Sequence, residues 1–172
     1  MNSIEGRSSF GHDDLVACGR GQGEWAGFPK LPLLPMLMFD RITSISEAGG
    51  EEDNGCIRAE LKISPQAWFF QCHFSNDPVM PGCLQLDALW QLTGFFLGWR
   101  GARGKGRALG VGHVKFSGEI LPSSRLVEYE VEILAARIRD TASLGRANGT
   151  LKCDGAVVCT AEELRVIISP SK

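Results

Sequence analysis

The chain has 172 residues, of which 44% are hydrophobic and 22% charged, and its formal net charge is −2. This length and balance are those of a globular protein with enough apolar residues for one core, so we expect a single domain over residues 1–172. The charge excludes a protein that depends on overall basicity to bind nucleic acid, and no apolar run reaches the about 18 residues of a membrane-spanning helix.

The six cysteines include no CxxC pair, and the three histidines lie far apart in the sequence. No metal-ligand spacing is therefore present, and we expect no metal. Because no secretory signal is visible at the N-terminus, we expect reduced thiols, most of them buried, in a cytoplasmic protein.

The N-terminal part of the chain predicts little regular structure. Residues 1–12 are polar and rich in Gly and Ser, so we expect them to be flexible. A short helix is predicted from Asp13 to Cys18, with acids at its start and Gly19 as its C-terminal signal. Six further Gly and Pro residues predict an extended loop over residues 19–35.

Two strands, at residues 36–46 and 56–63, are predicted to form a hairpin across a turn rich in Gly and acidic residues. Ser64-Pro65 is typical of a helix start, and we expect a single helical turn that ends near Phe70.

The most apolar stretch is the helix predicted at residues 83–99, which follows a loop at 71–82. Apolar residues occupy nearly all of its sides, so it must be buried on most of them. Beyond a Gly-rich basic loop, a period of two predicts strands at residues 107–118, 124–136, 140–152 and 156–168, and Asp154-Gly155 predicts a tight hairpin between the last two. About six strands and one dominant helix indicate an α+β fold, an antiparallel sheet curled around a central helix.

His73 lies in the Pro-rich loop before this helix. Histidine is suited to moving protons near neutral pH, although a loop histidine is often only structural. Asp87 lies about one turn into the helix among apolar neighbours. Because burying a carboxylate is costly, we expect it to be partnered, protonated or functional; the alternative is a solvated Asp near a helix N-terminus. Gln91, four residues on, could hydrogen-bond and orient Asp87.

Pro81-Gly82 immediately precedes the helix, so the first N–H groups, those of Gly82 and Cys83, lack intrahelical partners. Such groups can polarise a carbonyl oxygen. For the Cys83 side chain we expect a buried packing role. A loop histidine, a helix N-terminus and a desolvated carboxylate together suit proton removal next to a carbonyl and loss of a hydroxyl group.

The segment WFFQCHFSNDPVMPGCLQLDALWQLTGFFLGW (68–99) resembles the active-site segment of bacterial 3-hydroxydecanoyl-[acyl-carrier-protein] dehydratase/isomerases. LMFDRI (37–42) and KGRALGVGHVKFSG (105–118) resemble the same family, and the resemblance extends over about residues 13–168. It differs at Gln71 and Gln85, where that family often has glycine.

The resemblance implies a hot-dog fold, a homodimer and active sites shared between subunits. His73 of one chain would remove a proton from the substrate, Asp87 of the other would protonate the leaving hydroxyl, and the Gly82 N–H would bind the thioester carbonyl. It implies dehydration of medium-chain (R)-3-hydroxyacyl thioesters, with isomerisation of the trans-2- to the cis-3-decenoyl product, and it implies no cofactor. The alternatives are a dehydratase without isomerase activity, a hot-dog thioesterase and a non-catalytic acyl-binding module.

The partner that the resemblance implies is an acidic acyl carrier protein, so its docking surface should be locally basic. The candidates are Arg137, Arg139 and Arg165, and a second set lies in the 100–107 loop. The same loop, RGARGKGR, is short and has no interleaved aromatic residues, which argues against nucleic-acid binding.

Overall fold

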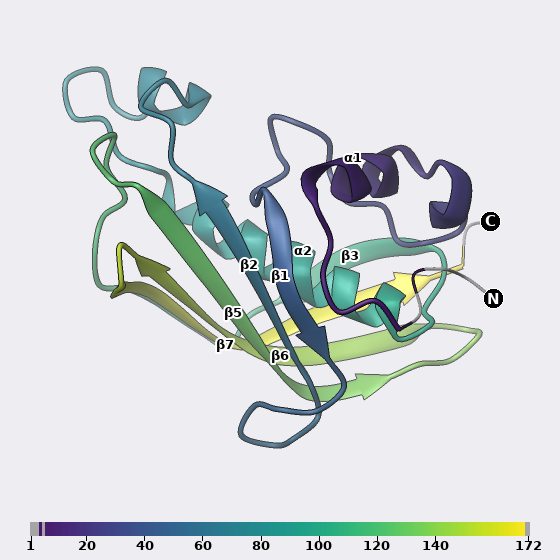
Figure 1. Ribbon diagram of the computed structural model, residues 1–172. Helices are drawn as coiled ribbons and strands as arrows, with labels where there is room; N and C mark the ends of the chain where they lie inside the picture. Colours follow the sequence, from purple (N-terminus) through teal and green to yellow (C-terminus); the bar gives the residue numbers. More distant parts are fainter. Residues whose placement is uncertain (1–3, 5, 171–172) are drawn as a thin grey trace.

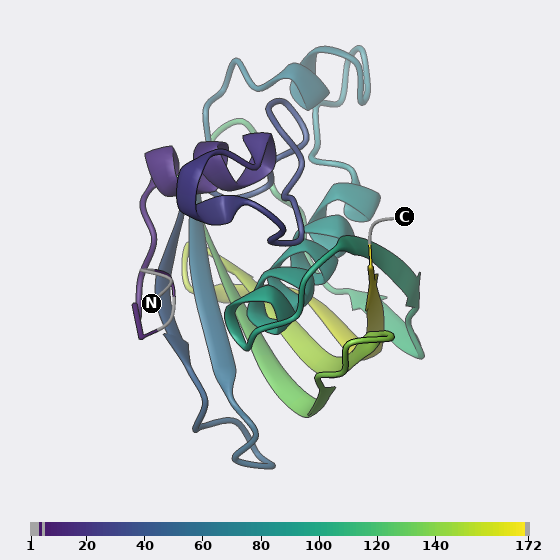
Figure 2. The same ribbon diagram turned by 90° about the vertical axis from the view of Figure 1, so that its right-hand side faces the viewer.

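The structure, a computed structural model, describes residue 4 and residues 6–170. Its strands are β1 (Arg41–Ser46), β2 (Cys56–Lys62), β3 (Lys105–Gly110), β4 (His113–Phe116), β5 (Leu126–Arg137), β6 (Ser143–Cys153) and β7 (Ala156–Ser169), and its helices are α1 (His12–Arg20), η1 (Gly23–Trp25), η2 (Trp68–Gln71) and α2 (Gly82–Trp99). The strands form one antiparallel sheet in the order β1-β2-β5-β6-β7-β3, and β4 also pairs with β7. This sheet curves around α2 (Figures 1 and 2). The predicted α+β architecture is confirmed, with seven strands in the described residues instead of about six.

Helix α2 is buried because both the sheet and the N-terminal segment cover it. Leu89 and Phe96 on α2 have no exposed surface. On another side, the ring of Phe95 contacts the rings of Phe10 and Phe28, with centroids 5.0 and 5.1 Å apart. Within the described part of the chain, no helix combines the length and apolar character needed to cross a membrane.

The N-terminal segment is packed, which contradicts the flexibility expected for residues 1–12. Ile4 and Phe10 are 1% and 2% exposed. Phe10 also exchanges two backbone hydrogen bonds with Ile42 at the start of β1, at 3.0 and 2.9 Å. The expectation is therefore wrong for the described residues, because Phe10 anchors an otherwise polar stretch; residues 1–3 and 5 lie outside the described part of the chain.

Helix α1 ends two residues later than predicted. Its last turn is closed by Gly21, which has a left-handed φ of 67° and whose N–H donates to the Cys18 carbonyl at 3.0 Å. Gly19, the predicted end signal, lies inside the helix instead. A Cβ at Gly19 would come within 2.7 Å of the Leu33 side chain, so this glycine permits close packing and does not end the helix.

Two elements of the first half begin later than predicted. Strand β1 begins at Arg41 and not at residue 36, because Leu37, Met38 and Phe39 are buried one after another, which a one-sided strand does not allow. The turn at Ser64 closes on Ala67, whose N–H donates to the Ser64 carbonyl at 3.0 Å, and the helical turn η2 follows it.

The strand predicted at residues 107–118 is divided into β3 and β4. Its neighbour β7 changes direction at Glu163, where φ is 58° and the N–H donates to the Asn148 side chain. The edge strand is interrupted at the same level, where the Gly112 N–H donates to the Glu162 carbonyl at 2.9 Å. The hairpin predicted at Asp154-Gly155 is confirmed between β6 and β7.

All six cysteines are free thiols, and four of them, Cys18, Cys56, Cys153 and Cys159, are buried as expected. Cys72 and Cys83 are exposed, so the buried role predicted for Cys83 is wrong. Its position in the first turn of α2 is not covered by the sheet.

Two of the six thiols should react readily with a thiol reagent, and the other four should be protected by burial. Burial raises the pKa of the Cys18 thiol to about 12 and the pKa values of Cys56 and Cys159 to about 11. Because the thiolate is the reactive form, a thiol dye should label two cysteines in the native protein and the rest only after denaturation. The double variant Cys72→Ser/Cys83→Ser should lose the fast reaction. Rapid labelling that persists in this variant would contradict the burial described here.

Candidate active site

His73 is held in a fixed orientation by the loop that precedes α2. The backbone N–H of His73 donates to the Phe69 carbonyl at 2.9 Å, and the backbone carbonyl of His73 accepts from the Val79 N–H at 2.8 Å. The ring Nδ1 lies 2.9 Å from the Val79 carbonyl oxygen. Since a carbonyl oxygen only accepts, Nδ1 carries a proton, and in the neutral ring Nε2 is left as a proton acceptor.

The ring of Phe74 stacks beside His73, with centroids 4.0 Å apart. Phe74 is itself 55% exposed. Met80, six residues after Phe74, is buried, and its backbone N–H donates to the Ile120 carbonyl. The histidine loop is therefore anchored on both sides, while the aromatic ring beside the histidine faces outward.

Asp87 is partly buried on α2 and is bound by Gln91 one turn further on. Gln91 Nε2 donates to Asp87 Oδ2 at 2.6 Å and to the Met36 carbonyl at 2.8 Å. The Met38 N–H donates to Gln91 Oε1 at 3.3 Å. The hydrogen bond expected between Gln91 and Asp87 is present, and the segment before β1 holds Gln91 in place.

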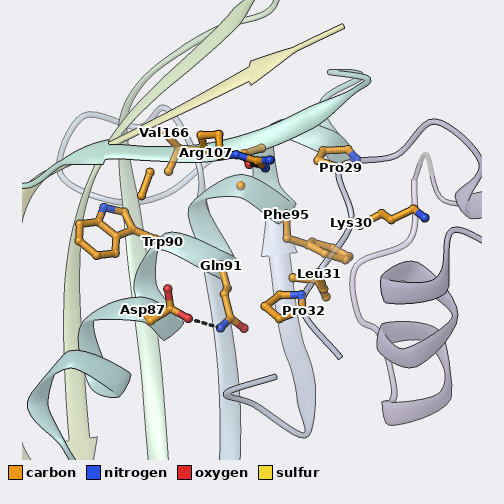
Figure 3. A pocket seen from close by; sticks show the side chains of 13 residues that line it. Pro29, Lys30, Leu31, Pro32, Asp87, Trp90, Gln91, Phe95, Arg107 and Val166 are labelled. Atoms are coloured by element: carbon orange, nitrogen blue, oxygen red, sulfur yellow. Dashed lines mark hydrogen bonds between the residues drawn. The ribbon is translucent and has the colours of Figure 1, made fainter. Parts of the chain in front are cut away.

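Asp87 and Gln91 lie at one end of a cavity of about 320 Å³. The cavity is bounded by residues 29–32, by one face of α2, by residues 106–108 of β3 and by Val166 of β7. Figure 3 shows Asp87 and Gln91 together at one end and Arg107 at the other, with Trp90 and Phe95 between them. Apart from Asp87, Gln91 and the cations Lys30 and Arg107 at the rim, its side chains are apolar. Such a cavity suits a chain-like apolar ligand with one polar group.

The N-terminus of α2 presents free N–H groups beside an aromatic ring. Within the described residues, the N–H groups of Gly82 and Cys83 have no hydrogen-bond acceptor, whereas the Leu84 N–H donates to the Pro81 carbonyl at 3.0 Å. The Phe116 ring of β4 lies against Gly82, and a Cβ added at Gly82 would come within 2.8 Å of it. The helix start therefore requires glycine and keeps two donors available at its positive end.

Not all of the expected site residues meet in one chain. His73 is not among the residues that line the cavity containing Asp87. Gln71 and Gln85 do not line it either: Gln71 is exposed, and Gln85 is 3% exposed inside the protein. Within the described residues, Gln85 Oε1 has no hydrogen-bond partner.

The three arginines expected to dock a carrier protein lie in two places. Arg137 and Arg165 border the same surface depression, together with the exposed apolar residues Leu109 and Leu144. Arg139 borders a different depression. In the alternative set, Arg103 borders the depression with Arg139, while Arg107 lines the cavity of Asp87.

The sequence analysis missed the segment at residues 29–32 and the backbone at Met36 and Met38. The first forms a wall of the cavity and the second anchors Gln91. A segment rich in Gly and Pro predicts a loop but not what the loop covers, so no local signal in the sequence indicated this role.

Solved structures with low sequence identity share the fold. One described as the dehydratase heterocomplex ApeI:P from Xenorhabdus doucetiae has a TM-score of 0.62 and 18% identity, over 81% of this chain and 87% of that one. A protein described as a putative thioesterase from Ralstonia eutropha, related to phenylacetic acid degradation, has a TM-score of 0.58 and 15% identity, over 90% of this chain and 98% of that one. A protein described as a hypothetical thioesterase with coenzyme A from Streptococcus pneumoniae has a TM-score of 0.53 and 11% identity, over 76% of this chain and 86% of that one.

The expected hot-dog fold is confirmed by these similarities, which at such identities concern the fold alone. The sequence itself matches the FabA-like domain over residues 31–162. This range contains the His73 loop, helix α2 and the wall that β3 contributes to the cavity, whereas Val166 of β7 lies just beyond it. Since the match covers well over half of the chain, the protein belongs to the FabA-like domain family.

Proposed function

We propose that the protein dehydrates (R)-3-hydroxyacyl thioesters carried by an acyl carrier protein and also moves the new double bond from trans-2 to cis-3. The observation that carries this proposal is a fixed carboxyl group at one end of a largely apolar cavity. Asp87 is held there by Gln91, whose own amide is bound to the backbone on both sides. A hydroxyacyl chain has a matching form, a polar reacting end on an apolar chain.

In this proposal Asp87 is the acid. In its protonated form it donates a proton to the 3-hydroxyl group as the bond from carbon 3 to oxygen breaks, and water leaves. Gln91 donates to one carboxyl oxygen at 2.6 Å, and the second oxygen would carry the proton for the substrate. The backbone hydrogen bonds of Gln91 to Met36 and Met38 hold its amide in one orientation.

His73 is the base. The bond between Nδ1 and the Val79 carbonyl fixes the tautomer, so Nε2 receives the proton from carbon 2. In the isomerisation, once this proton has passed to Asp87, His73 removes a proton from carbon 4 and Asp87 returns one to carbon 2. Both reactions then use the same pair of groups, and their protons balance.

The thioester carbonyl is placed at the N-terminus of α2. The free N–H groups of Gly82 and Cys83 would donate to the carbonyl oxygen, which gains negative charge as carbon 2 loses its proton. The positive end of the helix dipole stabilises the same charge.

Two copies of the chain would complete the site. Since His73 does not line the cavity of Asp87, a second copy has to bring its histidine to that cavity. The surface around the site supports such an interface: β3 is an edge strand of the sheet, and Leu109, Phe74 and Phe116 are each more than half exposed. The proposed assembly is a homodimer with two shared sites.

The proposed partner is an acidic carrier protein. Arg137 and Arg165 border one depression together with the exposed Leu144, so cationic and apolar groups are available side by side. This combination suits an acidic amphipathic surface better than charge alone. Arg139 borders a separate depression and would add positive charge at the edge of the carrier-binding surface.

The second candidate is a thioesterase, in which Asp87 would activate water against the thioester carbon. It is favoured by the similarity of the fold to two proteins described as thioesterases. A thioesterase releases a free thiol, whereas a dehydratase leaves the thioester intact.

Product analysis with a 3-hydroxydecanoyl thioester tests the proposal. We expect both trans-2- and cis-3-decenoyl thioesters and no free thiol. The trans-2 product alone would reduce the function to a plain dehydratase, and thiol release without an enoyl product would establish the thioesterase. With neither product, a non-catalytic acyl-binding role would replace the proposal.

A further inference from the structure

Gly94 is a glycine in the middle of α2 that the packing of the chain does not require. Glycine destabilises a helix interior relative to alanine, so its presence there needs another reason. A Cβ added at Gly94 would meet a single neighbour, Val166 Cγ1, at the ordinary contact distance of 3.8 Å. The position is therefore spacious, although it lies in the most buried helix of the protein.

The other two glycines of α2 provide the contrast. A Cβ at Gly82 would come within 2.8 Å of Phe116, and a Cβ at Gly98 within 2.7 Å of Phe28 and Pro29. These two glycines allow neighbouring segments to approach the helix. At Gly94 the missing side chain leaves space inside the cavity of Asp87, since Gly94 is one of the residues that line it.

The opposite wall of the cavity is also formed by a glycine. Gly106 of β3 lines the cavity, and a Cβ there would meet only Pro29 Cβ, at 3.9 Å. Phe95 and Leu31 add apolar surface next to it. Two missing side chains thus widen the cavity at the part that is remote from Asp87.

The distance from the acid to this wider part matches an acyl chain. Gly94 is seven residues beyond Asp87 on α2, which is about 10 Å along the helix axis. With carbon–carbon bonds of about 1.5 Å in a zigzag, an extended chain covers this distance with about eight carbons. We propose that Gly94 sets the length of the acyl chain that the cavity accepts, with the chain lying along α2 from Asp87 past Gly94. The inference rests on the proposed function only in that it identifies the cavity with the acyl site.

Binding of inert probes tests this inference without turnover. The probes are S-alkyl pantetheine thioethers from butyl to decyl, and the measurement is Kd by calorimetry. In the unmodified protein, affinity should increase with each methylene, by about fourfold where the methylene is fully buried. In Gly94→Leu the decyl-to-butyl affinity ratio should fall at least about tenfold, because the leucine fills the far part of the cavity. Gly94→Ala should have a smaller effect.

Gly11→Leu is the matched control, because Gly11 is exposed outside the cavity and has room for a side chain. This control should keep the decyl-to-butyl ratio of the unmodified protein. Should Gly94→Leu fail to fold by circular dichroism, Gly106→Val provides the same test from the opposite wall. An unchanged ratio in folded Gly94→Leu or Gly106→Val would overturn the inference.

A turnover assay separates this inference from the proposed function. The ratio of kcat/KM for 3-hydroxydecanoyl and 3-hydroxybutanoyl thioesters should fall in Gly94→Leu together with the binding ratio. If the binding ratio falls but the unmodified protein dehydrates neither thioester, the proposed function fails and the chain-length role of Gly94 stands. If the protein dehydrates both and neither ratio changes, the function stands and the role of Gly94 is refuted.

Discussion

Replacing His73 or Asp87 by alanine is expected to lower kcat/KM for a 3-hydroxydecanoyl thioester by about 10²–10⁴-fold, because each variant lacks one of the two proton-transfer groups. The fold should survive both changes. His73 is held largely through its backbone, and Gln91 keeps its two bonds to the segment before β1 when Asp87 is absent. The measurement is enoyl absorbance, with thermal unfolding to confirm the fold.

His113→Ala and Asp13→Ala are the matched controls for these two variants. Both residues are exposed, His113 on the edge strand β4 and Asp13 in the first turn of α1, and neither lines the cavity. Both controls should retain the activity of the unmodified protein. Undiminished turnover in a folded His73→Ala or Asp87→Ala variant would remove that residue from the proposed mechanism.

Mixing the two inactive variants is expected to restore about a quarter of the activity of the unmodified protein. With random subunit exchange, half of the dimers carry one chain of each kind, and each of these has one intact site out of two. The intact site combines His73 from the Asp87→Ala chain with Asp87 from the His73→Ala chain. The measurement is the same enoyl assay after incubation under conditions that allow exchange.

Exchange itself has to be verified with a tagged subunit, because an unexchanged mixture would also be inactive. Recovery would establish that the pair acts across the subunit interface. No recovery after verified exchange would show that His73 and Asp87 serve the same chain, or that the protein does not use them as a pair. The absence of His73 from the residues that line the cavity makes recovery the expected result.

The position of Gln91 shows how local and distant interactions combine at this site. The spacing of four residues on a helix was enough to predict its hydrogen bond to Asp87. The bonds of Gln91 to Met36 and Met38 join residues more than fifty positions apart. A local pattern therefore predicted the pair, whereas the fold determines how firmly the pair is held.

Local patterns also predicted most of the architecture. The alternation in β5 and the apolar residues around α2 indicate burial directly, because a strand repeats every two residues and a one-sided helix cannot be apolar all round. The Asp154-Gly155 turn adopts the backbone conformation that its residues favour. These features depend on neighbours in sequence, so they can be predicted without the tertiary structure.

Features that depend on distant contacts could not be predicted in this way. The division between β3 and β4 follows from the left-handed residue Glu163 on another strand, and the order of the N-terminal segment follows from Phe10 in an aromatic cluster on α2. Likewise, the sequence alone placed His73 in the loop before α2, and Gly82 and Asp87 in the first two turns of that helix. Only the tertiary structure decided that residues 29–32, β3 and β7 enclose Asp87 in a cavity, because its walls come from segments that no sequence period connects.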